Sequence, residues 1–270
     1  MALVNSLTNL LTSDSISKSR ALNARQLILL PLVGGVTLFV WQAAIWLNDF
    51  PAFILPSPGQ VASRAGLALS DGTLARHTFI TLGESLSGLT LGLIVAALLG
   101  YLLAQSRTLE RLLAPYIVAS QSIPIVAVAP LLIIWFGSGL TSKILICALI
   151  VFFPVLINII VGLRSVEPDL RDLMRTLRAS RWQTFLNLEL PAALPLLLSG
   201  LKIGATLSVI GAVVGEFSGS NSGLGFLIIA ARGQFDTPLV FVAVFALIAI
   251  ALSMYGSVAL LEKILFAWKN

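Results

Sequence analysis

The sequence predicts an all-α membrane protein with about six transmembrane helices. Its 270 residues are 57% hydrophobic and only 11% charged, and the mean hydropathy is +0.98. This composition is typical of a multi-spanning membrane protein, because a soluble domain this apolar has too little polar surface to cover itself. The apolar residues also fall in runs of about 20, the length that crosses a bilayer as a helix.

Six apolar runs account for the expected spans. They lie at 27–47, 79–104, 113–136, 144–163, 191–214 and 238–260. Pro124 and Pro130 fall within the third run and are expected to kink that helix, since proline frees backbone carbonyls. The Gly- and Ser-rich segment after the fifth run is expected to contain a short re-entrant helix at 224–231.

The distribution of lysine and arginine predicts the orientation. Twelve basic residues lie in the polar N-terminal arm (1–26), the second and fourth connections and the tail (263–270), against four in the other connections. Basic residues gather on the cytoplasmic side of a membrane protein. Both termini and the fourth connection (165–189) are therefore expected in the cytoplasm, and the membrane domain (27–262) in the bilayer of the cell membrane. The net charge of +5 follows from this placement, so no nucleic-acid partner is expected.

The connection 165–189 is rich in charge yet patterned as a helix. Pro168 suits the first turn of a helix, and the acidic residues around it favour the same start. Two apolar groups follow at helical spacing: Leu170, Leu173, Met174 and Leu177, then Trp182, Phe185 and Leu186. The pattern predicts two short amphipathic helices at the cytoplasmic surface. One explanation of their apolar faces is that they only cover the end of the helix bundle.

No motif for covalent chemistry is present. The stretch GSGLTSK at 137–143 approaches a phosphate-binding loop, but it lacks the glycine before the lysine, and Ile144 stands where a magnesium-binding hydroxyl belongs. One histidine and one cysteine cannot build a metal cluster. We therefore expect no enzyme, catalytic residue, cofactor or metal site. Energy for uphill transport would have to come from another subunit or from an ion gradient.

Small residues recur every four positions in two of the spans. The second span carries Gly88, Gly92, Ala96, Gly100 and Ala104, and the fifth carries Gly200, Gly204, Ser208 and Ala212. Such ridges let helix backbones approach closely within lipid. Glu84 and Glu216 continue the two ridges toward the external side at the same spacing.

These two glutamates are expected to face other helices or a cavity, because lipid exposure of a carboxylate is costly. One interpretation makes them part of a solute path. The path candidates are Glu84, Gln121, Ser122 and Glu216. The alternative is that the glutamates bond to helix ends or pair with a cation such as Arg76 or Arg232.

The stretch DLMRTLRASRWQTFLNLELPAALP at 172–195 resembles the EAA loop of ABC-importer permeases, the binding-protein-dependent inner-membrane component. Asp172 falls at the Glu of that motif, and Leu190–Pro191 matches its closing Leu–Pro. Arg178 stands where the motif has glycine. Because glycine permits a tight bend there, Arg178 predicts either a looser bend or a strained backbone.

Three other stretches are similar to the nitrate, sulfonate, taurine and bicarbonate branch of that family: ILPSP at 54–58, SIPIVAVAPLLIIWFGSG at 122–139 and GAVVGEFSGSNSGLGFLI at 211–228. Within the branch, QSIPIVAVAPLLIIWFG and RSVEPDLRDLMRTL look more like permeases for riboflavin or a thiamine-precursor pyrimidine. The resemblance implies the type I ABC importer permease fold. It also implies two ATP-binding subunits, a second permease copy in a homodimer and an extracytoplasmic substrate-binding protein.

In that family a coupling helix of this loop docks in a groove of the ATP-binding subunit. The residues that would make the contact are Leu170, Asp172, Leu173, Met174, Leu177, Arg178 and Trp182. The expected function is thus ATP-driven import of riboflavin or a thiamine-precursor pyrimidine. Nitrate, sulfonate or taurine is the alternative substrate class, although Glu84 and Glu216 would not attract anions. A secondary transporter or channel is the alternative of another class, and it would leave the charged loop without a partner.

Overall fold

The computed structural model describes residue 29 and residues 31–266. The expected N-terminal arm (1–26) and the end of the expected tail lie outside this part. Every regular element within it is helical, so the predicted fold class is confirmed. The chain divides into two units, 1–63 and 64–270. The first contains the helix Pro31–Asn48, an 18-residue candidate span.

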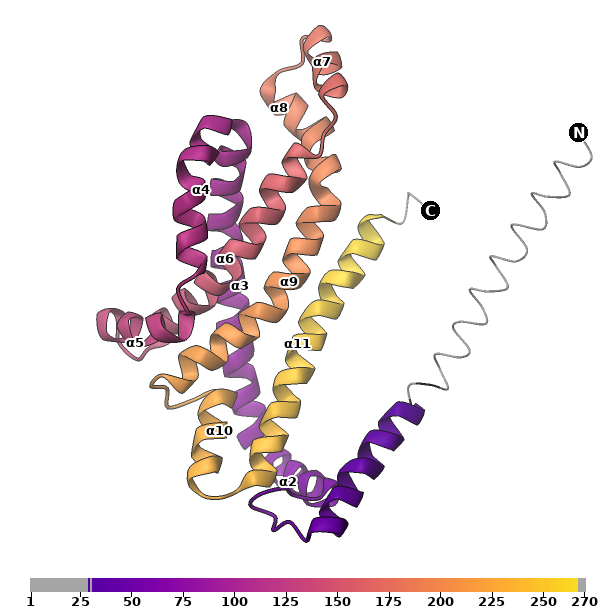
Figure 1. Ribbon diagram of the computed structural model, residues 1–270, viewed down its shortest axis with the longest axis vertical. Coiled ribbons are helices and arrows are strands. Elements are labelled where there is room, and N and C mark those ends of the chain that lie inside the picture. Colours follow the sequence, from indigo (N-terminus) through magenta and orange to yellow (C-terminus); the bar gives the residue numbers. More distant parts are fainter. Residues whose placement is uncertain (1–28, 30, 267–270) are drawn as a thin grey trace, which may run out of the picture. The chain divides into compact units, whose positions relative to one another are not determined.

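The remaining elements follow in chain order (Figure 1). They are α2 (Pro58–Ser70), α3 (Thr73–Gln105), α4 (Arg107–Gln121), α5 (Ile125–Phe136), α6 (Leu140–Arg164), α7 (Pro168–Thr176), α8 (Arg181–Thr184), the π-helical turn η1 (Phe185–Glu189), α9 (Leu190–Phe217), α10 (Leu224–Gly233) and α11 (Thr237–Leu265). Within residues 31–266, five helical stretches are long and apolar enough to cross a membrane, and the bent pair of α4 and α5 would be a sixth.

The third predicted span is broken rather than kinked. The helices α4 and α5 meet at 91°, and Figure 1 shows α5 turning sharply away from α4. Pro124 is the N-cap of α5 and has extended backbone angles (φ −62°, ψ 119°). Proline lacks an N–H and disfavours helical geometry in the residue before it, which favours a helix end at this point. Pro130 lies inside α5 without ending it. The prediction of one helix across 113–136 was therefore wrong.

The second predicted surface helix is shorter than expected and is not separate from the fifth span. Ser180 caps the single turn of α8 in a capping box with Gln183. The turn η1 then continues directly into α9, so that Arg181–Phe217 is one 37-residue candidate span. The short helix predicted at 224–231 is confirmed as α10.

The predicted small-residue ridges pack against α6, which contacts both α3 and α9. A methyl group built on Gly92 of α3 would lie 2.8 Å from the Ala148 carbonyl oxygen of α6. One built on Gly200 of α9 would lie 2.8 Å from the Asn158 side chain of α6. The backbones of three helices therefore approach as closely as the ridges predicted, with α6 as their shared partner.

Candidate functional site

The loop 165–189 presents a largely exposed apolar surface. No residue of α7 or α8 is buried, and Figure 1 places this helix pair beyond the ends of α6 and α9. The side chains of Leu173, Leu177 and Trp182 are 53%, 68% and 67% exposed. Leu170 is also exposed, and Met174 is half-buried. Apolar side chains gathered at a protruding tip are typical of a protein–protein contact.

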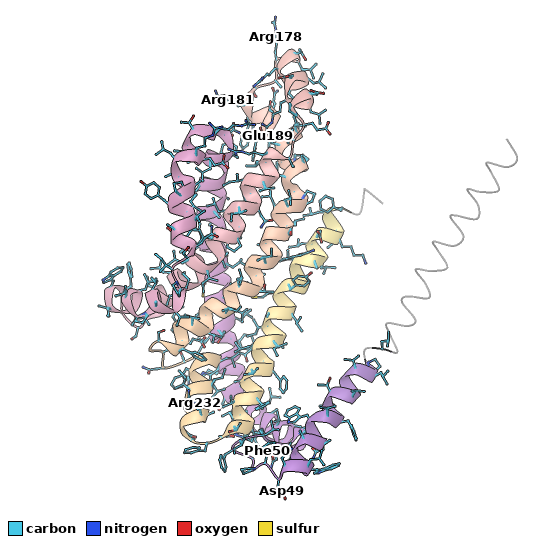
Figure 2. The ribbon with its side chains drawn as sticks, viewed as in Figure 1. Asp49, Phe50, Arg178, Arg181, Glu189 and Arg232 are labelled. Atoms are coloured by element: carbon cyan, nitrogen blue, oxygen red, sulfur yellow. The ribbon has the colours of Figure 1, made fainter. Side chains whose placement is uncertain are left out.

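Arg178 closes α7 in a left-handed backbone conformation, with φ of 53°. Its N–H donates to the Arg175 carbonyl at 3.0 Å, and the Ala179 N–H donates to the Met174 carbonyl at 3.0 Å. This pair of bonds is the Schellman cap, in which glycine is the usual left-handed residue. Of the two expected outcomes at this position, the structure shows a tight bend with a strained arginine. Figure 2 shows Arg178 at the outer end of the loop.

Asp172 pairs with a neighbour on α7 rather than with the ends of the spans. Its carboxylate accepts from Arg175 at 2.9 Å, and both side chains are mostly exposed, so the pair contributes little to stability. Trp182 stacks on Phe185, with ring centroids 5.7 Å apart. Asp172 and Trp182 therefore both lie at the surface of the loop.

Two arginines bind the base of the loop to the ends of the spans. Arg171 Nη2 donates to the Leu163 carbonyl at the end of α6, at 2.7 Å, and lies 3.6 Å from the Glu189 carboxylate. Arg164 Nη2 donates to the Leu103 carbonyl near the end of α3, at 2.8 Å, and its Nη1 pairs with Glu110 of α4. Guanidinium groups thus satisfy carbonyls that helix ends leave unpaired.

Glu84 is buried and bound to a lysine. Its carboxylate accepts from Lys143 Nζ at 2.7 Å, and the two side chains are 2% and 7% exposed. Lys143 lies just before the fourth predicted run (144–163) and was therefore expected in an external turn, but α6 begins at Leu140 and this lysine is buried. The cation beside Glu84 is therefore neither Arg76 nor Arg232.

Glu216 takes part in capping the start of α10. Three successive backbone N–H groups there donate to side chains of α3 and α9: Gly223 to His77 Nδ1 at 2.9 Å, Leu224 to Thr81 Oγ1 at 2.8 Å, and Gly225 to Glu216. The Thr81 hydroxyl in turn donates to Glu216 at 2.7 Å. These contacts satisfy donors that a helix start leaves free.

Sequence reasoning missed His77 and Thr81. His77 and Thr81 lie eleven and seven residues before Gly88, and these helical spacings place them on the same face of α3 as the ridge of small residues. That spacing was the available signal. Their partners on α10 are more than 140 positions away in the chain, and no local pattern indicates such a contact.

The structure does not bring the four path candidates together. Gln121 is the last residue of α4 and Ser122 follows it, and both are exposed. Glu84 and Glu216 are buried and hydrogen-bonded. Among the described residues no group of three His, Cys, Asp or Glu side chains could hold a metal ion.

Comparisons with known proteins identify relatives over most of the chain. Residues 88–266 match the family described as the binding-protein-dependent transport system inner membrane component. The riboflavin transport system permease protein RibX of Chloroflexus aurantiacus is 51% identical over 240 residues, which cover 89% of this chain and 90% of RibX. The formylaminopyrimidine transport permease protein ThiX of Halalkalibacterium halodurans is 36% identical over 231 residues, or 86% and 92% of the two chains.

The taurine transport system permease protein TauC of Escherichia coli is also 36% identical, over 81% of this chain and 82% of TauC. The family branch predicted from the motifs is therefore confirmed.

Two solved structures share the fold. One, an amino acid ABC transporter with histidines, has a TM-score of 0.58 at 16% identity and covers 73% of this chain and 96% of its own. The other, the MetNI methionine ABC transporter in inward-facing conformations, has a TM-score of 0.53 at 21% identity and covers 67% and 95%.

These structural neighbours are importer permeases of type I fold, as the motifs predicted. With the family match covering more than half of the sequence, the chain belongs to the family of binding-protein-dependent transport system inner membrane components, the permease subunits of ABC importers.

Proposed function

We propose that this permease works as a homodimer with two ATP-binding subunits and an extracytoplasmic substrate-binding protein. The loop 165–189 would face the cytoplasm and dock on an ATP-binding subunit. The observation that carries the proposal is the exposed apolar surface of α7 and α8, since Leu173, Leu177 and Trp182 are each more than half exposed. A loop that only covered the bundle end would turn these side chains inward.

The base of the loop supports a mechanical role. Arg171 bonds α7 to the end of α6, and Gln105 Nε2 at the end of α3 donates to Glu189 at 3.3 Å. Glu189 lies in η1, which continues into α9. Closure of the ATP-binding subunits would thus move the ends of three packed helices together. Such rigid-body movement of packed elements is a common form of switching between two states.

We infer that Glu84 and Glu216 act at the external end as packing and gating residues rather than as contacts for the solute. Both are buried and bonded to α6 or α10. Gln121 and Ser122 remain our proposed path residues. They lie at the break between α4 and α5, where backbone groups freed from the helix need polar partners or a cavity.

Riboflavin is the proposed substrate, with a formylated pyrimidine precursor next. The proposal is supported by the relative named for riboflavin transport, which is 51% identical, against 36% for those named for formylaminopyrimidine and taurine transport. Uptake of labelled riboflavin, pyrimidine precursor and taurine into vesicles that contain the reconstituted complex measures this directly. Saturable uptake of taurine alone would overturn the substrate proposal.

The coupling proposal predicts the outcome of truncating the loop. Replacing Leu173, Met174 and Leu177 by alanine should abolish ATP-driven uptake and leave membrane insertion intact. A matched control is L67A/L69A, which truncates two side chains of α2 that are each 60% exposed and should leave uptake unchanged. Uptake that survived in the loop variant would show that the coupling assignment is wrong. Gradient-driven uptake without any ATP-binding subunit would instead favour a secondary transporter or channel.

A further inference from the structure

Four of the nine residues that line a cavity at the base of the loop are arginines. The cavity has a volume of about 440 Å³ and lies where the ends of α3 and α6 meet α7. Its charged wall residues are Arg107, Arg164, Arg171, Asp172 and Arg175. Small-molecule sites are roughly 300–1,000 Å³ in volume. The cavity therefore has room for a small anionic group, and its wall has the matching charge.

The arginines keep donors that the protein does not use. Arg171 Nε is buried and has no hydrogen-bond partner among the described residues, although Nη2 of the same side chain is bonded to Leu163. A buried donor without an acceptor destabilises the fold. Arg107 is exposed and makes no ion pair within the described part of the chain. Arg107 is therefore free to bind an oxygen-rich ligand, and Arg171 lines the same cavity.

The carboxylates nearby do not cancel the positive charge. Glu110 and Glu189 pair with Arg164 and Arg171, but neither belongs to the cavity wall. Asp172 belongs to the wall, is mostly exposed and is engaged by Arg175. The wall itself thus carries four guanidinium groups and one carboxylate, and Arg107 is the wall arginine for which no ion pair is seen within the described residues. The one acidic wall residue would repel an anion placed beside it, so the ligand belongs nearer Arg107 and Arg171.

Two helix starts add to this field. Arg107 is the first residue of α4, and Pro168 is the first residue of α7. Both line the cavity. The start of a helix carries unpaired N–H groups and a partial positive charge, which favour phosphate and other anions. Glu110 and Asp169 in the first turns compensate part of this charge, so the four arginines supply most of the attraction for an anion.

We propose that this cavity binds a phosphate group. The group comes either from an anionic phospholipid headgroup in the adjacent leaflet or from soluble phosphate. The wall joins the end of α3, the end of α6 and the start of α7, so a bound phosphate would stiffen the attachment of the loop to the spans. This inference does not depend on the identity of the transported nutrient or on docking of an ATP-binding subunit.

The test compares the thermal unfolding midpoint of the full-length permease in neutral detergent under three conditions. These are added phosphatidylglycerol, added phosphatidylcholine and added inorganic phosphate. A ligand that binds only the folded state raises the midpoint as its concentration rises. We expect phosphatidylglycerol or inorganic phosphate to raise it by several degrees, and phosphatidylcholine to have little effect, since its phosphate is masked by a cation. A midpoint shift with phosphatidylglycerol alone would identify the lipid headgroup as the source of the bound phosphate. A shift with both phosphatidylglycerol and inorganic phosphate would show that the free anion is sufficient for binding.

Arg107→Gln is the diagnostic variant, because this exposed side chain can be changed without breaking an ion pair. We expect it to weaken apparent phosphate or phosphatidylglycerol binding about tenfold, the effect of losing about 1.4 kcal/mol. Arg111→Gln removes the same charge one turn further along α4, outside the cavity wall, and should bind as wild type does. Equal losses in the two variants, or equal shifts with phosphatidylglycerol and phosphatidylcholine, would overturn the proposal.

A second measurement guards against a variant that fails to fold. Native mass spectrometry of the intact protein counts bound phosphatidylglycerol directly, so it scores only folded molecules. Arg171→Gln should lower that count as Arg107→Gln does, even if its unfolding midpoint falls because a bond to α6 is lost. A lipid count that stays at the wild-type value in both variants, together with an unchanged response of both to inorganic phosphate, would contradict the site.

Discussion

Arg178 occupies a backbone position that favours glycine. Left-handed geometry costs a residue with a side chain about 1–2 kcal/mol relative to glycine, and the Schellman bonds around Arg178 show that the protein accepts this cost. Strain that persists in a surface loop points to a role for the side chain itself. An exposed guanidinium at the tip is suited to the contact proposed for the loop.

Arg178→Gly should therefore stabilise the isolated permease by about 1–2 kcal/mol. A higher unfolding midpoint in detergent measures the gain. Arg181→Gly is the matched control, because Arg181 lies in α8 with right-handed helical geometry, where glycine costs about 1 kcal/mol. The two variants should shift the midpoint in opposite directions. A fall in the midpoint for Arg178→Gly would mean that the left-handed strain is relieved elsewhere.

The buried ion pair of Glu84 and Lys143 predicts how single and double substitutions change the stability of the protein. Removing one partner of a buried ion pair leaves an uncompensated charge and costs about 3–5 kcal/mol, whereas replacing both is often far milder. Lys143→Met and Glu84→Gln should each destabilise the protein strongly, and the double variant should recover much of the loss. The unfolding midpoints of the wild-type protein, the two single variants and the double variant form a double-mutant cycle. Additive losses would show that the two side chains do not interact.

At the scale of helices, the fold depends on how closely α6 approaches its neighbours. Gly92→Ala should destabilise the protein, because the added methyl would sit 2.8 Å from a backbone oxygen of α6 that cannot move aside cheaply. Gly83→Ala, in the same helix, would meet nothing within 4 Å and should be neutral or gain up to about 1 kcal/mol of helix propensity. Thermal unfolding of the two variants compares them. Equal behaviour would argue against close packing of α3 on α6.

At the scale of the whole molecule, the proposed orientation can be tested at the two ends of the spans. Figure 2 shows Arg178 and Arg181 near one end of the second unit and Arg232 toward the other. The single native cysteine, Cys147, is fully buried and should react slowly. Labelling of a cysteine introduced in place of Arg181 or Arg232 can therefore be distinguished from any reaction of Cys147.

A membrane-impermeant maleimide should label Arg232→Cys in intact cells and Arg181→Cys only after the membrane is opened. The reason is the positive-inside distribution, which places the loop in the cytoplasm. The unsubstituted chain is the background control. Labelling of Arg181→Cys in intact cells would invert the proposed orientation and remove the loop from reach of a cytoplasmic ATP-binding subunit.

Much of the fold could be predicted because hydropathy and spacing are local. The apolar runs located the spans, the four-residue ridges identified the packed faces of α3 and α9, and proline and glycine marked where helices end. The break at Pro124 was underestimated as a kink, because proline at 124 and proline at 130 look alike in sequence. Only Pro124 ends a helix, and the neighbours that decide this lie outside any local window.

The sequence by itself determined the membrane class, the positions of most spans, the amphipathic loop and the glycine position taken by Arg178. These depend on hydrophobicity and backbone preference within a few turns of chain. Only the tertiary structure decided that Lys143 pairs with Glu84, that His77, Thr81 and Glu216 cap α10, and that four arginines line one cavity. Such pairings join helices far apart in sequence. They form because burying a charge or a helix end without a partner is costly, and which partner is near depends on the packing of α6 between α3 and α9.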